Sequence, residues 1–600
     1  MQYVGARYVP KFMGLYDATQ AYEALCVVDN GMGTSYITKV PAPAGTPLTD
    51  TDYYAIYGAS SGAIINLQNQ VDALKAGKVY SVDNISDLLS LDCNDGECAY
   101  VKGYYSIDDG GAAFYAISSV AFGFNHALNN GLYANIIIES VMRPEQFGAK
   151  GDGIADDTAA INDALAYAKN VKFENHYKVD TASADAYHVY IDVPSNRTLS
   201  GNGTIEVGAN SYDQYAIFGM IVESATPKTN ITFDGLTIIG DKSAHTGTTG
   251  EWGFGIAIYG ANNITVRNCK ISNCWGDGIY VGRYGTDTNN PHDIKICGNV
   301  VDGCRRNNVS VVSCERILID GNSLLNASGT SPQGGIDIEP DHNTTDLIDD
   351  AVISNNIVKD NAGYGINVAY TDIHGTTFNT RNVKIIGNDI SGASCIGSFI
   401  QNIVSGQGAA NTNLVIANNI YHDLMFFIMC EGVECLIDNN IFRNSATSSI
   451  TSCLRANDGL GGHYVISNNL FENCWGLQHI CRLNNCRLDF INNVLSECDA
   501  PATLRFDGNA YIKNNVMKKY ETAREVVVIQ NMSVNDPVVI SDNVVCERSS
   551  PNASLIFVQW AGVSPDATKT AVSNNIVECT TFGTETTYYG GNNFMNGAAV

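Results

Sequence analysis

Two acidic residues, Asp337 and Glu339, stand two positions apart in the apolar segment 333–340, which reads QGGIDIEP. In a β-strand, alternate side chains share a face, so both acids should point outward with Cα atoms about 6.5 Å apart. Glycosidases hold two carboxyl groups about 5 to 9.5 Å apart. Like charges at such a distance raise one of the two pKa values and create an acid beside a base. The spacing therefore predicts a catalytic pair, and a structural salt-bridge network is the alternative.

Neighbouring segments predict equivalent strands on successive turns of the chain: 253–260, 275–282, 306–313 and 363–370. Aligning them gives one predicted outward column: Ala257, Tyr280, Ser310, Asp337 and Asn367. Asp277 would then lie two turns from Asp337, about 10 Å away by strand spacing. We interpret Asp277 as a third catalytic residue, with a turn residue as the alternative. Arg306, on the turn between, could bind a sugar carboxylate or neutralise Asp337.

Further residues are predicted to contact a ligand. Tyr280 and Asn367 belong to the outward column, and four residues are expected in flanking loops along the groove: His292, His342, Tyr370 and His374. Three later segments carry arginines at equivalent positions: Arg455, Arg482 and Arg505, with Asp458 and Asp507 nearby. If they stack, they form a basic ladder that holds an acidic polysaccharide or pairs with its own acids. No nucleophilic Ser/His/Asp set, phosphate-binding loop or zinc motif is present.

A repeat from residue 230 onward positions these side chains. Thirteen copies, from NITFDGLTI to KTAVSNNIV, each read as a short strand, an Asn-containing bend and another strand. The Asn residues that we align follow one another at gaps of 21 to 34 residues: Asn268, Asn299, Asn322, Asn356, Asn388, Asn419, Asn440, Asn469, Asn493, Asn515, Asn543 and Asn575. Asn tolerates the left-handed backbone of a bend, and stacked Asn side chains can hydrogen-bond from coil to coil. The period predicts an all-β solenoid, a right-handed parallel β-helix.

Four regions are expected along the chain. Residues 1–58 predict a small β module, and residues 59–78 a short coiled coil with the seam Ile64, Leu67, Val71 and Leu74, or a helix packed on its own domain. Residues 79–142 predict a second β domain, with a hairpin around Asp109-Gly110-Gly111. Residues 143–600 form the β-helix, with a helix near 157–169, capped by Asp156, Asp157 or Thr158, that covers its open end.

Composition limits the partners. The 35 basic and 62 acidic residues give a net charge of −27, so no nucleic-acid footprint is expected. No signal peptide and no apolar run of membrane-spanning length are apparent, which predicts synthesis in a cytoplasm and no membrane insertion. The 18 Cys residues are then expected to be reduced and buried, with Cys304, Cys474 and Cys498 at similar repeat positions in an interior stack.

Several segments resemble phage tail proteins. RPEQFGAKGDGIADDTAAINDALAYA, residues 143–168, resembles the opening of pectate-lyase-like β-helix proteins, and the two N-terminal modules resemble those of phage and prophage tailspikes. GIDIEP is similar to a string in β-helix proteins that act on glycans. The resemblance implies a homotrimeric tailspike of the virion tail. Its N-terminal module, residues 1–58, would attach to phage tail or baseplate proteins, or contact sugar through its aromatic faces.

The function expected from this resemblance is binding and hydrolysis of a bacterial surface polysaccharide. The alternatives are a non-catalytic receptor-binding fibre, a polysaccharide lyase on the same fold, and a free glycan-degrading enzyme. No cofactor is expected. The aspartates of the GDGIADD segment leave a structural or catalytic divalent cation as a second interpretation.

Overall fold

The computed structural model describes most of the chain and divides it into two compact units. The first comprises residues 1–150 and 163–171, and the second residues 151–162 and 172–600. The described residues are 11–29, 34–59, 79–185, 187–221, 226–283, 289–341, 345–370, 379–402, 410–445, 452–457, 462–475, 479–484, 486–498, 502–518, 525–530, 537–546, 556–561, 570–577, 593–595 and 598–599. The predicted coiled-coil seam lies outside them.

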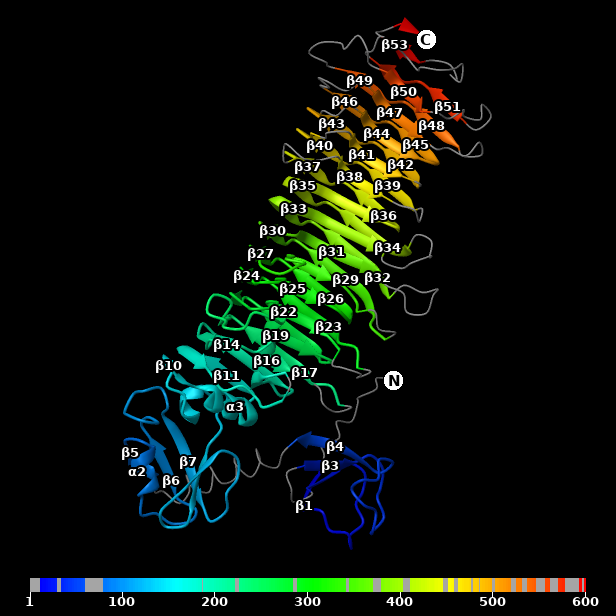
Figure 1. Ribbon diagram of the computed structural model, residues 1–600. Coiled ribbons are helices and arrows are strands. Elements are labelled where there is room, and N and C mark those ends of the chain that lie inside the picture. Colours follow the sequence, from blue (N-terminus) through cyan, green and yellow to red (C-terminus); the bar gives the residue numbers. More distant parts are fainter. Residues whose placement is uncertain are drawn as a thin grey trace, which may run out of the picture. The chain divides into compact units, whose positions relative to one another are not determined.

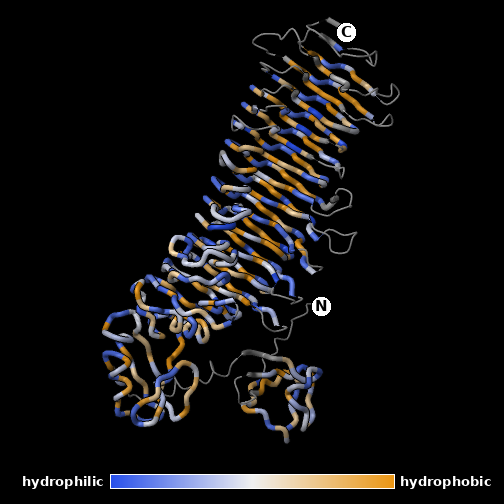
Figure 2. Tube along the Cα trace, viewed as in Figure 1, coloured by the Kyte–Doolittle hydropathy of each residue, from blue (hydrophilic) through white to orange (hydrophobic). Residues whose placement is uncertain are grey.

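The second unit is a right-handed parallel β-helix, as predicted (Figure 1). A 15-stranded sheet runs from β11 (Asn170–Phe173) to β51 (Thr570–Ser573). A 30-stranded sheet contains two rows of strands, because most of its strands also pair with the strand two places away. The long strands β33 (Asp389–Asn402) and β35 (Ile420–Glu431) run through both rows and join them. Figure 2 shows hydrophobic and hydrophilic residues alternating along the stacked strands, as side chains point alternately inward and outward.

One row of the 30-stranded sheet carries the candidate site. Its strands follow one another from coil to coil: β16 (Gln214–Met220), β19 (Trp252–Tyr259), β22 (Ile279–Gly282), β25 (Val309–Val311), β28 (Ile336–Ile338), β31 (Tyr364–Tyr370), β33, β35, β38 (Ser452–Asn457), β41 (His479–Asn484), β44 (Ala502–Asp507), β47 (Glu525–Gln530) and β50 (Ile556–Ala561). Because each strand pairs in parallel with the next, residues at one register position stack along the helix.

A ladder of buried Asn side chains holds the coils together. The Oδ1 atom of Asn440 accepts hydrogen bonds from the backbone N–H and the Nδ2 of Asn419, at 2.9 and 3.0 Å. The Nδ2 of Asn440 donates to the Ile416 carbonyl at 2.9 Å. The same contacts repeat along the Asn ladder: Asn299, Asn322, Asn356, Asn388, Asn419, Asn440, Asn469, Asn493, Asn515, Asn543, Asn575 and Asn593.

The predicted alignment is wrong at its first position. Asn268 is exposed and has a φ of 56°, so it occupies the left-handed bend. The next residue, Cys269, is buried and takes the ladder position, where its backbone N–H donates to Asn299 Oδ1 at 2.9 Å. In later coils the bend residue also precedes the ladder Asn, as Asn439 with a φ of 53° precedes Asn440. Two adjacent residues therefore have different roles: the first forms the bend, and the second makes the hydrogen bonds from coil to coil.

The predicted helix is α3 (Thr158–Tyr167), slightly shorter than the expected 157–169. The side chain of Asp156 accepts from the Thr158 N–H at 3.1 Å and satisfies a free donor of the first turn. The Nδ2 of Asn162 donates to the Tyr190 carbonyl at 2.8 Å, which ties the start of the helix to β13 (Val189–Asp192). Ile161 and Leu165 are fully buried, in agreement with the predicted apolar face.

Two small sheets precede the β-helix. The first contains β1 (Lys11–Leu15), β2 (Cys26–Asp29), β3 (Thr34–Thr38) and β4 (Tyr54–Ala59). The second has the order β5 (Val79–Val82), β6 (Cys98–Val101), β7 (Ala113–Ser118), β9 (Tyr133–Ile136) and β8 (Asn125–Ala127), with α2 (Ile85–Leu89) after β5. The predicted hairpin exists, but its strands are β6 and β7. Asp109 instead lies in the connection and accepts four backbone N–H groups.

The cysteines are interior residues. The sixteen cysteines whose side chains are described are free of disulfides, and all but Cys297 are buried. Cys474 contacts Cys453 and Cys498 in the core, so the predicted stack includes Cys474 and Cys498. No helix in the described part of the chain is long and apolar enough to cross a membrane.

Candidate active site

The predicted column exists in the register of the strands. Tyr280 pairs with Ser310, Ser310 with Asp337, and Asp337 with Asn367. The expectation of an open outward surface is wrong, however, because only 2% of Asp337 and 8% of Tyr280 are exposed. Every residue of β22, β25 and β28 is buried, on both faces of the strands. Glu339, directly beyond β28, is partly exposed.

Asp337 and Glu339 are close enough to hydrogen-bond through their carboxyl groups. The carboxyl groups are thus closer than the roughly 5 to 9.5 Å expected for a glycosidase pair. The side chains of residues i and i+2 can converge even when their Cα atoms are well separated. Burial and, after it, the neighbouring Asp337 charge together raise the pKa of Glu339 to about 7, although the Arg306 cation opposes them. Burial also raises the pKa of Asp337. The two acids therefore do not titrate independently of each other.

Asn307 and Asn367 hold the carboxylate of Asp337. Asn367 Nδ2 donates to Asp337 Oδ1 at 2.8 Å, and Asn307 Nδ2 donates to Asp337 Oδ2 at 3.0 Å. Asn307 Nδ2 also donates to Ser310 Oγ at 2.9 Å, and the Asn307 backbone N–H donates to Asp277 Oδ1 at 2.9 Å. Sequence reasoning missed Asn307. Asn307 could have been found from the aligned segments, because it occupies the position of Asp277 on the next coil. The hydrogen bond from the Gly278 N–H to the Asn307 carbonyl reflects this register.

Arg306 lies among the acids, on the coil between Asp277 and Asp337. Its Nη1 is 3.3 Å from Asp277 Oδ2, and its Nε is 3.6 Å from Glu251 Oε2. Burial lowers the pKa of Arg306, but the carboxylates of Asp277 and Asp337 raise it above its ordinary value, so Arg306 stays a cation. Asp277 is fully buried, and this burial raises its pKa to about 6, although Arg306 and the Asn307 N–H oppose the shift.

A cavity of about 220 Å³ adjoins this cluster. Its walls include Tyr187, Trp252, Tyr259, Tyr280, Arg283 and Asp346. Asp341 also lines it and lies two residues beyond Glu339, whose pKa its charge raises. Sequence reasoning missed Arg283, Asp341 and Asp346, although Asp341 continues the alternation of acids after Asp337 and Glu339. Neither acid of the pair lines this space, but Tyr280 connects it to the column of Asp337 and Asp341 to Glu339.

Some predicted binding residues lie elsewhere. Tyr370 is not in a loop: it ends β31 and is fully buried. His292 begins β23 (His292–Cys297) in the 15-stranded sheet and contacts Asp293, so it does not face this groove. His342 and His374 lie outside the described residues.

The three arginines do stack. Arg455 pairs with Arg482, and Arg482 with Arg505. They continue the column of Asp337, since Asn367 pairs with Phe399, Phe399 with Met429 and Met429 with Arg455. An Arg column (Arg455, Arg482, Arg505) thus extends from the acid pair along the same face.

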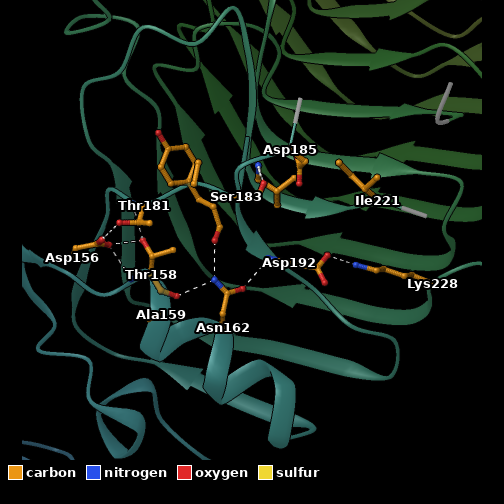
Figure 3. A pocket seen from close by; sticks show the side chains of 13 residues that line it. Asp156, Thr158, Ala159, Asn162, Thr181, Ser183, Asp185, Asp192, Ile221 and Lys228 are labelled. Carbon is orange, nitrogen blue, oxygen red and sulfur yellow. Dashed lines mark hydrogen bonds and ion pairs between the residues drawn. The ribbon is translucent and has the colours of Figure 1, made fainter. Parts of the chain in front are cut away.

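A larger cavity, of about 830 Å³, lies at the start of α3 (Figure 3). Its polar groups contact one another: Asn162 Nδ2 donates to the Tyr190 carbonyl, and Lys228 pairs with Asp192. Hydrogen bonds from Thr158 and Thr181 outweigh burial and lower the pKa of Asp156. Asp156 is therefore held as a carboxylate and is no candidate for a general acid. Throughout the described residues, no three His, Cys, Asp or Glu side chains are grouped to hold a metal ion.

Fold and site together define a parallel β-helix with an acidic cluster on one face. No protein-family profile matches the chain. It is 28% identical over 449 residues to the uncharacterized protein YclG of Bacillus subtilis, covering 66% of this chain and 74% of that protein. It is 27% identical over 185 residues to the capsule K30/K69-specific depolymerase of Klebsiella phage K64-1, covering 28% of this chain and 23% of the depolymerase.

Solved structures of similar fold include the tailspike protein gp49 of Acinetobacter baumannii bacteriophage Fri1, a capsular polysaccharide depolymerase. The two chains share 14% identity with a TM-score of 0.47, and the match covers 84% of this chain and 75% of gp49.

Proposed function

We propose that the chain is a phage tailspike subunit that binds a bacterial surface polysaccharide and hydrolyses it at Asp337 and Glu339. One observation carries the proposal: a partly exposed carboxyl group with a pKa near 7 contacts a buried carboxylate that is held by amide donors. Glycosidases need an acid and a base in different protonation states at the same pH. The sequence similarity to a phage capsule depolymerase supports the substrate class.

The two acids would take different roles. Asn307, Asn367 and Arg306 favour negative charge on Asp337, so the shared proton resides on Glu339. Glu339, the more exposed acid, would donate this proton to the glycosidic oxygen. Asp337 would accept a proton from the attacking water. A glycan entering between them would replace their mutual hydrogen bond, since catalytic contacts often form only in the substrate complex.

Asp277 would act indirectly, through Arg306. Because it is fully buried and contacts Arg306, we assign it as a positioning residue that holds the Arg306 cation near Asp337. Arg306 remains charged and is a poor candidate for the base of a lyase. The charges present thus favour hydrolysis over elimination, with carboxyl groups alone and no cofactor. Dialysis against EDTA should then leave the rate unchanged.

The Arg column would bind acidic sugar residues farther along the same face. Tyr280 and Asn367 would line the groove, Tyr280 through the adjoining cavity and Asn367 by orienting Asp337. We further propose a homotrimer attached to phage tail or baseplate proteins through residues 1–58, on the resemblance of the N-terminal modules. Light scattering on the intact chain should give three copies, and a monomer would contradict this part.

The test is incubation with a panel of bacterial capsular and envelope polysaccharides. New reducing ends without new double bonds would support hydrolysis. Unsaturated products would indicate a lyase, and binding without any product would indicate a receptor-binding fibre.

A further inference from the structure

We infer that the 220 Å³ cavity lined by Arg283, Tyr280 and Trp252 binds one neutral pyranose ring of the polysaccharide. Its role as a subsite rests on the proposed cleavage at Asp337 and Glu339, whereas sugar binding itself can be measured separately. The inference combines the position, size, walls, free donor and charge of the cavity.

The position places a bound sugar next to the acid pair. Tyr280 lies in the same column as Asp337, two coils away, with Ser310 between them. Val312, another wall residue, follows Val311, whose carbonyl accepts the Glu339 N–H at 3.0 Å. Neither acid lines the cavity, but a glycan with one ring bound here could extend along these coils toward Glu339.

The size and walls fit one sugar ring. At about 220 Å³ the cavity is smaller than the roughly 300 Å³ at which pockets for drug-sized ligands begin. Tyr280 packs against Phe254 and Tyr259, with ring centroids 4.7 and 4.9 Å apart. Trp252 is 45% exposed and offers an aromatic face at the rim. Aromatic rings of this kind pack against the C–H face of a sugar while their polar tips hydrogen-bond.

Arg283 supplies a buried donor that needs an acceptor. It is 8% exposed, and its Nη1 lies 3.9 Å from Asp346 Oδ1, beyond hydrogen-bond distance. Its Nε finds no hydrogen-bond partner among the described residues. A buried guanidinium N–H without an acceptor is unfavourable, and a sugar hydroxyl in the cavity would satisfy it.

The charges of the cavity select an uncharged sugar. Two carboxyl groups, of Asp341 and Asp346, face a single arginine. Burial and the Asp341 charge already raise the pKa of Asp346 to about 6, which shows how unfavourable further negative charge would be. Hydroxyl groups can donate to Asp346 and accept from Arg283. A neutral hexopyranose therefore fits better than a uronic acid.

The experiment uses the intact chain with Glu339→Gln, which prevents turnover. Saturation-transfer NMR and titration would measure binding of methyl glucoside, methyl galactoside, methyl mannoside and methyl glucuronide. At least one neutral glycoside should bind, more tightly than the glucuronide. Adding Arg283→Met should weaken it about tenfold or more, as expected for a hydrogen bond to a charged group. Arg316→Met, the same change at an exposed residue of the 15-stranded sheet, should leave binding unchanged.

Trp252→Ala provides a second variant at an exposed position, in case Arg283→Met fails to fold, and it too should weaken binding. The inference is overturned if no neutral glycoside binds, if the glucuronide binds more tightly, or if neither variant weakens binding. Cleavage by the wild-type chain separates the two claims. Cleavage without Arg283-dependent binding refutes only the subsite, and Arg283-dependent binding without cleavage refutes only the hydrolysis.

Discussion

Arg306 Nη1 lies 3.3 Å from Asp277 Oδ2, and this ion pair places a cation beside Asp337 and Glu339. Because the pair is mostly buried, water screens it less than it would a surface contact. The Arg306 cation lowers the pKa of Asp277, Asp337 and Glu339, whereas burial raises it. The Arg306 cation therefore lowers the pH at which the acid pair loses its proton.

Replacing Arg306 should change the pH profile as well as the rate. Arg306→Met removes a cation that lowers the pKa of Glu339, so the alkaline limb of kcat/KM should move to higher pH while kcat falls. Arg306→Lys keeps the charge and should restore part of the wild-type limb. Rate–pH profiles of both variants test this, with Arg316→Met as the control. An unshifted limb in Arg306→Met would show that the cation does not act on the acid pair.

The wild-type rate itself should depend on the protonation of Glu339. A general acid must carry its proton, so kcat/KM should be high below pH 7 and decline as pH rises through about 7, the pKa of Glu339. An ordinary Glu, deprotonated well below neutral pH, would give a decline at far lower pH. A profile that keeps rising above pH 8 would rule out Glu339 as the acid.

The Asn ladder should contribute to stability at each coil. Asn440→Ala leaves the Asn419 N–H and the Ile416 carbonyl without their side-chain partners, at a cost of about 1–3 kcal/mol for each unsatisfied group. The Tm should fall measurably in calorimetry. Asn439→Gly, at the adjacent exposed bend with a φ of 53°, is the matched control and should have little effect. An equal decrease in Tm in both variants would contradict the different roles assigned to the ladder residue and the bend residue.

The Arg column should make binding depend on salt and on glycan charge. Arg482→Gln removes the middle cation of three stacked residues, so binding of an acidic polysaccharide should weaken and become less sensitive to salt. Binding of the same polymer after chemical reduction of its carboxyl groups should not change. Titrations with both forms at two salt concentrations are the measurement. Equal weakening for both forms would mean that the arginines have a structural role.

The sequence predicts stacking far better than it predicts side-chain contact. The column through Ser310, Asp337 and Asn367 follows from alternation within strands, which is local and repeats in every coil. The position of the Asn ladder is harder to predict. Most later copies carry two adjacent Asn residues, and the sequence pattern does not show which of the two points inward. NITVRNCKI has only Asn268 at this place, and the inward position there belongs to Cys269.

The contacts within the site could not be predicted from spacing. Whether two acids at i and i+2 converge depends on what surrounds them, here Asn307, Asn367 and Arg306 on adjacent coils. The burial of Tyr370 and the cavity around Arg283 likewise depend on segments that are distant in the sequence.

The central claim is that Asp337 and Glu339 cleave the glycan, and the most direct measurement is the release of reducing ends from a polysaccharide that the wild-type chain degrades. Asp337→Asn and Glu339→Gln are nearly isosteric, so each should lower the rate by roughly 100-fold or more through loss of acid–base help. Both variants should stay folded and still bind the glycan. Glu339→Gln, at the partly exposed position, should keep the wild-type Tm, whereas Asp337→Asn sets an NH2 group against an amide donor and should lower it. Cleavage by both variants at the wild-type rate would contradict the account.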